Sequence, residues 1–149
     1  MKRQIIRFLF LLVGLTSMSA VKATSPEQMV VSFQHDYTIW NDQSFRDRQP
    51  AGGNQAMQLA EQNYRAMLKK YTKPDFQGEP IAYGSDSSHD PMREKITAQK
   101  IDENSAIITT QVAGEYYSPV YEYHFSKENK KWYLTQIFLV DEDGKYPSL

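Results

Sequence analysis

The segment from Glu94 to Asp141 constrains the fold more than any other part of the chain. It contains runs in which apolar and polar residues alternate, which is the period of a strand with one buried face. These runs cover residues 106–113, 120–125 and 132–140. The polar links Asp102–Ser105 and Lys127–Lys130 have the length and the residue types of hairpin connections. The pattern therefore predicts an antiparallel meander.

Two parts of this meander carry further information. The run 132–140 has bulky groups on both faces, so we expect it to be the central or most covered strand. An additional strand is predicted over Glu94–Asp102, where Ile96 and Ala98 share one face. Ile101 is out of step with them, which indicates a β-bulge.

An amphipathic helix is predicted near the start of the domain. Ser25 can cap it, Pro26 suits its first turn, and Gln28 completes the pattern of a capping box. Its apolar stripe repeats every three or four residues and consists of Val30, Phe33, Tyr37 and Trp40. This spacing predicts that one face of the helix packs on the sheet.

A second helix is expected to begin near Asn54 and to end before Pro74. Its predicted stripe consists of Met57, Ala60, Tyr64, Met67 or Leu68, and Tyr71. Between the helices, Asn41–Asn54 is predicted to be a mobile polar connection with a turn of helix around Phe45, and later Pro80–Tyr83 is a candidate short strand. Together these elements predict an α+β fold, with two or three N-terminal helices packed on a curved antiparallel sheet of about four to five strands.

Residues 1–23 are typical of an export signal. The basic residues at its start are Lys2, Arg3 and Arg7. Ile5–Leu15 is an apolar run that is too short to span a bilayer, so a signal cleaved near Ala23 is favoured over an uncleaved anchor. Residues 24–149 are then expected to form one periplasmic domain.

Composition excludes several classes of function. The chain has no cysteine, which excludes disulfides, thiol nucleophiles, zinc sites that use sulfur and a lipoprotein anchor. Without the four basic residues of the predicted signal, the 17 basic residues fall to 13 against 18 acidic ones, a net charge of about −5. A domain of that sign binds nucleic acid or anionic membrane poorly and is steered toward basic partners, although such a charge also serves solubility alone.

Histidines and nearby carboxylates are the remaining candidates for catalysis, because phosphate-binding loops and nucleophile elbows are absent from the sequence. His35 and Asp36 are neighbours on a helix, where successive side chains point about 100° apart, so their spacing does not make a dyad. His124 alternates with Tyr123 and Phe125 and is expected on the outer face of the sheet. We predict no catalytic residue and no cofactor.

The closest cluster of metal-ligand residue types is Asp86, His89 and Asp90, in the polar segment 84–91. Carboxylate and imidazole ligands suit many ions, but this spacing is unspecific. The segment is also rich in turn formers, which favours a solvated loop, and no metal site is predicted. Asp141–Gly144 begins like a calcium loop, but its glycine comes too early and the later glutamate is missing, so it is predicted to be a turn.

Tyrosines in the sheet region offer a further signal. Tyrosine provides a large contact area at a low entropic cost, which is why protein interfaces favour it. Tyr116 and Tyr117 are adjacent and face opposite ways, so at least one of the two rings should be exposed. The predicted partner-binding residues are Asp86, His89, Asp90, Tyr116 and Tyr117.

The segments 121–125, 132–137 and 140–146 resemble bacterial immunity proteins that have the nuclear transport factor 2-like cone fold. The layout of a capped helix, a second helix and a terminal meander is similar to that fold over Ser25–Leu149, with the closest likeness over residues 120–149. Proteins of that family neutralise toxins delivered between competing bacteria. No binding residue is carried over from the resemblance.

The resemblance implies a periplasmic immunity or inhibitor protein that occludes the active site of a cognate toxin. The segment 84–91, or the edge near Tyr116 and Tyr117, would enter the toxin's cleft. The alternative is an envelope protein of the cone fold that binds a small molecule or is weakly catalytic. A catalytic role predicts a deep pocket and a titratable group with a perturbed pKa, whereas a binding role uses the same pocket without chemistry. A homodimer is left open, because exposed sheet faces of this fold commonly pair.

Overall fold

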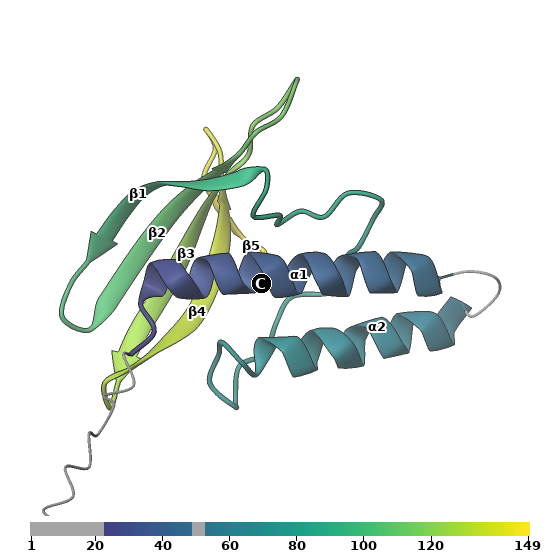
Figure 1. The fold of residues 1–149 in the computed structure, drawn as a ribbon, viewed down its shortest axis with the longest axis horizontal. Helices are drawn as coiled ribbons and strands as arrows, with labels where there is room; N and C mark the ends of the chain where they lie inside the picture. Colours follow the sequence, from purple (N-terminus) through teal and green to yellow (C-terminus); the bar gives the residue numbers. More distant parts are fainter. Residues whose placement is uncertain (1–22, 49–52) are drawn as a thin grey trace, which may run out of the picture.

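The computed structural model describes residues 23–48 and 53–149, so residues 1–22 of the predicted signal lie outside the described residues. Its elements are α1 (Pro26–Asp47), α2 (Gly53–Leu68), β1 (Glu94–Ile101), β2 (Ser105–Val112), β3 (Val120–Glu128), β4 (Lys131–Val140) and β5 (Lys145–Pro147). The five strands form one curved antiparallel sheet in sequence order. Figure 1 shows α1 crossing one face of this sheet and α2 running alongside α1. The predicted α+β class is confirmed.

Helix α1 begins as the capping pattern predicts and continues further than expected. The Ser25 hydroxyl accepts a hydrogen bond from the Gln28 backbone at 3.3 Å, and the Gln28 side chain accepts one from the Ser25 backbone at 3.1 Å. Within the predicted connection, the expected turn of helix around Phe45 is confirmed, but the helix is continuous from α1 to Asp47, and residues 49–52 lie outside the described residues. The reason is tertiary, because the buried Asn41 side chain exchanges two hydrogen bonds, each 3.0 Å long, with the backbone of Gly84.

Helix α2 confirms most of its predicted stripe. The residues that are buried are Ala60, Tyr64, Met67 and Leu68, followed by Tyr71 just beyond the helix. Met57 is 46% exposed, so its place in the stripe was wrong. Figure 1 shows that the first turns of α2 extend past the sheet and lie alongside α1. A hydrogen bond of 2.8 Å from the Trp40 indole to the Ala60 carbonyl ties the two helices together.

The sheet is the predicted meander with three corrections. Strand β3 lies at its centre instead of β4. Lys145–Pro147 adds an unpredicted edge strand beside β4. Pro80–Tyr83 forms no strand. The predicted bulge is confirmed between Ile96 and Ala98, and the predicted turn at Asp141–Gly144 is closed by a 3.0 Å backbone hydrogen bond.

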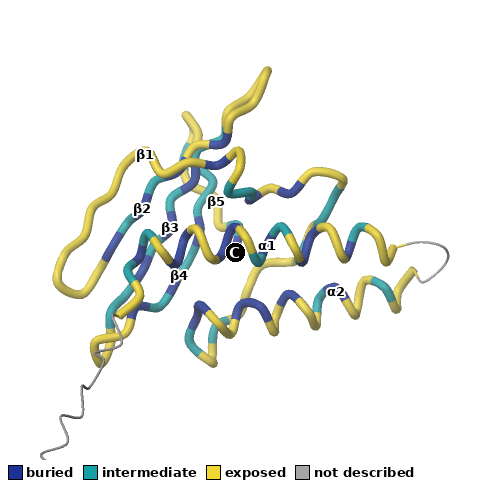
Figure 2. The backbone as a smooth tube through the Cα atoms, viewed as in Figure 1, coloured by how far each residue is buried: buried dark blue, intermediate teal, exposed yellow. Residues whose placement is uncertain are grey.

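The core lies between the sheet and α1. Side chains from the two layers meet there, and the fully buried ones include Val30, Phe33, Ile108, Tyr123, Leu134 and Ile137. Strand β1 is different, because every residue after Glu94 is exposed. Figure 2 shows this contrast between β1 and the alternating burial of the neighbouring strands.

Candidate functional site

A buried polar cluster lies at the end of the sheet where β1 begins. Glu94, the first residue of β1, accepts hydrogen bonds from the Thr110 hydroxyl at 2.5 Å and from the Tyr123 hydroxyl at 2.8 Å. The Nδ1 atom of His89 lies 3.0 Å from the Glu94 carboxylate and 2.9 Å from the Tyr123 hydroxyl oxygen. All four residues are at most 2% exposed. We call Glu94, His89, Tyr123 and Thr110 the buried polar cluster.

Local structure explains why these side chains converge. Thr110 and Tyr123 occupy inward positions of β2 and β3, which alternate between buried and less buried residues. Asp90 closes a turn before β1. Its carbonyl accepts a hydrogen bond from the Glu94 backbone at 2.7 Å, and its side chain accepts one from the Met92 backbone at 2.8 Å. This turn holds Glu94 on the same inner face as the hydroxyl groups of the two strands.

The His89 backbone and ring are both held by their surroundings. Its carbonyl accepts hydrogen bonds from the Ser87 hydroxyl at 2.6 Å and the Thr38 hydroxyl at 2.8 Å. The ring is surrounded by aromatic rings with centroid distances of 4.6 to 5.7 Å, which belong to Phe33, Tyr37, Tyr121 and Tyr123. Such edge and tilted contacts fix an aromatic ring in place. The arrangement leaves the imidazole little freedom to move.

Electrostatics favour an ionised Glu94. Burial acts to raise the pKa of the Glu94 carboxyl, but the hydrogen bonds and charge of its partners, led by His89, outweigh burial and lower the pKa below its usual range. Burial, and after it the negative charge of Glu94, hold the pKa of Tyr123 well above its usual range. Tyr123 therefore stays a neutral hydrogen-bond donor beside a buried carboxylate.

Gln34 adds an unpaired polar group to this region. Its side chain is 1% exposed, and among the residues that the structure describes its amide nitrogen has no hydrogen-bond partner. The amide lies near the Tyr123 hydroxyl and offsets part of the rise in the pKa of Tyr123. Its nitrogen nevertheless makes no hydrogen bond of regular geometry. An unpaired buried amide costs stability, on the order of 1–3 kcal/mol.

A cavity of about 230 Å³ adjoins the cluster. It is lined by aromatic and polar side chains that include Tyr37, Trp40, Tyr64, Ser88, His89 and Tyr121, together with the C-terminal residues 147–149. Burial raises the pKa of Tyr121 to about 12, so this hydroxyl is neutral at physiological pH. Sites for drug-sized ligands usually measure about 300–1,000 Å³, which makes this cavity small. It offers one imidazole, the carboxylate of Glu79 and several hydroxyls, and Glu94 is not among its lining residues.

The structure separates the predicted cluster Asp86, His89 and Asp90. Asp86 is exposed, whereas His89 is 2% exposed, so the expectation of a solvated loop is wrong for His89. The His89 side chain points inward and contacts the carboxylate of Glu94. This contact cannot be predicted from the polar residues that surround His89 in the sequence. Asp90 forms the turn before β1 and lies 3.8 Å from Arg93. In the ranges 23–48 and 53–149 no group of three potential ligand residues is arranged to hold a metal ion.

Tyr116 and Tyr117 are both exposed, with 93% and 62% of their surfaces accessible. They lie in the link between β2 and β3, which projects beyond the sheet at the top of Figure 1. A Cβ atom at Gly114 would lie 1.8 Å from the Tyr117 carbonyl oxygen, so the link closes tightly only because residue 114 is glycine. A role of these residues in binding a partner stays a prediction.

The other histidines do not enter the cluster. His35 is exposed, and Asp36 instead accepts hydrogen bonds from Tyr71 at 2.7 Å and from Lys70 at 3.0 Å. His124 is on the outer face, as predicted, 2.8 Å from Glu122 and packed against Phe138.

Sequence reasoning missed Glu94 as the centre of the site. A buried carboxylate needs partners, but no local signal marked Glu94 as buried, because it shares the side of Ile96, which is 37% exposed. The identity of those partners depends on the pairing of β1, β2 and β3, which no local pattern contains.

Within the described part of the chain, no helix has the length and apolarity required to cross a membrane. Comparison with family models, with curated proteins and with solved structures finds no match to this chain. The resemblance to immunity proteins of the cone fold therefore stays a prediction from the sequence.

Proposed function

We propose that this protein is a periplasmic inhibitor of the immunity type, which binds a toxin delivered to the cell envelope and occludes its active site. The observation that carries the proposal is the exposed pair Tyr116 and Tyr117 at the tip of a projecting link. Two exposed aromatic rings on a tightly closed link are the kind of anchor that enters a pocket on a partner. Such a role requires no catalytic group inside the protein.

The surroundings of the tip favour a basic partner. The pairing of Val120 with Val140 brings the turn after β4 to the same end of the sheet as the tip. The exposed acidic residues at this end are Glu115, Asp141, Glu142 and Asp143, and none forms an ion pair with another described residue. Of the exposed basic residues at this end, Arg93 and Lys145 are paired with carboxylates, which leaves Lys95 against these four acidic residues. The remaining excess of negative charge steers the tip toward a positively charged cleft. Met92 is 80% exposed, and its neighbour Arg93 accepts a 2.9 Å backbone hydrogen bond from Ala113 at the base of the link.

The interior supports a binding role over a catalytic one. The polar groups of the buried polar cluster bond to one another and lie beneath packed aromatic rings. A catalytic base must come within hydrogen-bond reach of a substrate. Glu94 has no exposed surface on its side chain, so it stabilises the fold in this arrangement.

A competition experiment tests the proposal. A strain of the native host that lacks this protein is grown together with its parent, which still produces the toxin. We expect the deletion strain to be killed and to be rescued by the wild-type protein. A Tyr116→Ala, Tyr117→Ala variant should rescue poorly, while the matched variant Ile39→Ala, which removes an exposed apolar group on α1, should rescue fully. Equal survival of the deletion strain and its parent would count against an immunity function.

A small-molecule-binding role is the second candidate, because His89 lines the 230 Å³ cavity with three tyrosines. A ligand of that size would be smaller than most metabolites that proteins bind in dedicated sites. Native mass spectrometry of the protein purified from its own periplasm distinguishes the two roles. A retained small molecule that is lost in a His89→Gln variant favours this second role.

A further inference from the structure

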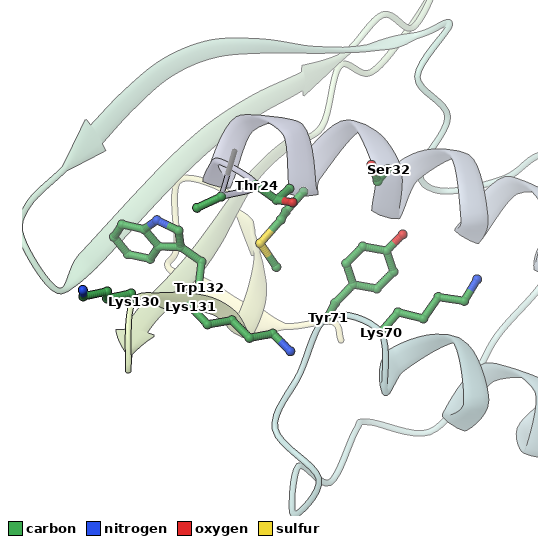
Figure 3. A pocket seen from close by; sticks show the side chains of 9 residues that line it. Thr24, Ser32, Lys70, Tyr71, Lys130, Lys131 and Trp132 are labelled. Atoms are coloured by element: carbon green, nitrogen blue, oxygen red, sulfur yellow. The ribbon is translucent and has the colours of Figure 1, made fainter. Parts of the chain in front are cut away.

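A second concave site lies at the end of the sheet opposite to the Tyr116–Tyr117 tip. It has a volume of about 410 Å³ and lies between the start of α1, the residues after α2 and the hairpin that joins β3 to β4. Figure 3 shows the side chains that line it. Its volume falls within the range of about 300–1,000 Å³ that is usual for small-molecule sites.

The floor of this pocket is apolar and well packed. Met29, Tyr71 and Trp132 form it, and each is at most 8% exposed. Two of the three carry flat aromatic rings, and Figure 3 shows Trp132 and Tyr71 on opposite sides of the hollow. Such a floor can receive the aromatic or alkyl body of a ligand and remove it from water.

The rim of the pocket is positively charged. Lys70, Lys130 and Lys131 surround the floor. Figure 3 shows Lys131 running between Trp132 and Tyr71, with the amino groups of Lys70 and Lys130 farther out. Lys70 is paired with Asp36 at 3.0 Å, but neither of the other two lysines forms an ion pair with any residue that the structure describes.

This local charge is opposite to that of the domain. Lys127 lies 5.2 Å from the Trp132 ring and adds to the positive potential, while the nearby Glu128 is already paired with Lys73. Strand β3 has nine residues and so separates the acidic tip from this pocket by roughly 30 Å. Screening at physiological salt has a length of about 8 Å, so the acidic tip has little effect on the field at the pocket. The exposed Asp102 and Glu103 are closer, because the carbonyl of Asn104 in their hairpin accepts a hydrogen bond from the Lys127 backbone at 2.9 Å, and they offset part of the charge of Lys127.

We propose that this pocket binds a small organic anion with an aromatic or alkyl body. The carboxylate, sulfonate or phosphate head would lie at Lys130 and Lys131, and the body would lie on Met29, Tyr71 and Trp132. The site uses none of the residues of the acidic tip, so this proposal stands or falls independently of the inhibitor function. No covalent chemistry is involved.

The backbone conformation of Lys130 allows its side chain to be removed without an expected loss of stability. Lys130 and Asn129 have φ angles of 65° and 49°, the left-handed region in which glycine is the preferred residue of such a hairpin turn. A Lys130→Gly variant therefore removes the positive charge and also removes the strain of a side chain in the left-handed region. Its resistance to urea should be at least that of the wild type, while anion binding weakens.

The test uses 8-anilinonaphthalene-1-sulfonate, a fluorescent aromatic anion, with the purified protein as the cell processes it. Its uncharged relative N-phenyl-1-naphthylamine controls for apolar binding alone. We expect saturable sulfonate binding, competition by dodecanoate, and clearly weaker binding of the uncharged probe. Lys130→Gly and Lys131→Gln should each weaken sulfonate binding roughly fivefold, since a lysine near an anion contributes on the order of 1 kcal/mol.

Lys100→Gln is the matched control, because Lys100 is an exposed lysine on β1 outside the pocket; it should bind like the wild type. Unchanged near-ultraviolet circular dichroism of every variant shows that the fold is intact. The proposal is overturned if no saturable binding occurs, if both probes bind equally well, or if the pocket variants bind like the wild type. It is also overturned if a short polyglutamate peptide displaces the probe and dodecanoate does not, because the surface would then recognise an acidic peptide.

Discussion

The buried carboxylate of Glu94 offers the sharpest test of how this fold is stabilised. A Glu94→Gln variant keeps the shape of the side chain but removes its charge, and it replaces one accepting oxygen with a donating NH₂ group. The carboxylate has donors on both oxygens, from Thr110 at 2.5 Å and Tyr123 at 2.8 Å on one, with His89 at 3.0 Å from the other. After the substitution the NH₂ group that faces His89 can donate to its Nδ1 atom only if the imidazole carries its proton on Nε2, so the cluster must at least change its pattern of donors.

The expected cost follows from the burial of this pair. The side chains of Glu94 and His89 are 0% and 2% exposed, and a hydrogen bond to a buried charged group contributes about 1.5–3 kcal/mol, so losing the charge that Thr110, Tyr123 and His89 share should cost at least about 3 kcal/mol of unfolding free energy. A domain of this size has a total stability on the order of 5–15 kcal/mol, so the variant should be severely destabilised. The midpoint of thermal unfolding should fall by roughly 10–20 °C.

The measurement is urea denaturation at pH 7, followed by tryptophan fluorescence. Glu122→Gln is the matched control, because Glu122 also has a histidine partner, His124 at 2.8 Å, but lies on the outer face with a 17% exposed side chain. This control should cost less than about 1 kcal/mol, as is usual for solvent-accessible pairs. A cost below 1 kcal/mol for Glu94→Gln itself would refute the reasoning that the cluster holds the end of the sheet together.

The pH dependence of the unfolding free energy gives an independent check on the role of Glu94. The pKa of Glu94 is lowered in the folded protein, so its stabilising contribution is fully present above the unfolded pKa of about 4.3 and is lost as the pH falls through the folded value. The difference in stability between the wild type and Glu94→Gln should therefore shrink on acidification. A difference that stays constant from pH 7 to the acid limit of folding would contradict this assignment.

Two further predictions concern single side chains. Ser25→Ala removes the hydroxyl that caps α1 and should lower the unfolding free energy by about 0.5–2 kcal/mol, whereas Ser25→Asp should restore it; an unchanged urea midpoint in Ser25→Ala would argue against the cap. Gln34→Met replaces a buried, unpaired amide with an apolar group of similar length and should leave the stability unchanged or raise it by about 1 kcal/mol, measured by the same urea titration; a loss above 2 kcal/mol would mean that the amide is satisfied in solution.

Several elements could be predicted from the sequence because their causes are local. The alternation in residues 106–113 and 120–125 identified β2 and β3, because a half-buried strand exposes and buries side chains in turn. The capping box from Ser25 to Gln28 identified the start of α1, since it depends on residues only three positions apart. The bulge near Ile96 was visible as a shift in the same alternation.

Other features were decided only by the tertiary structure. Asn41 and Ser44 looked like residues of a polar connection, but they are buried within α1 because the backbone of Gly84 reaches back to Asn41. His89 looked like a residue of a solvated loop, yet the carboxylate of Glu94 holds it in the core. The lysine-rimmed pocket likewise joins residues from separate parts of the chain, so no spacing in the sequence reveals it. The periodicity of a sequence indicates which face of each helix or strand is buried. It does not indicate which distant residues meet, because those contacts form only when the helices and the sheet pack together.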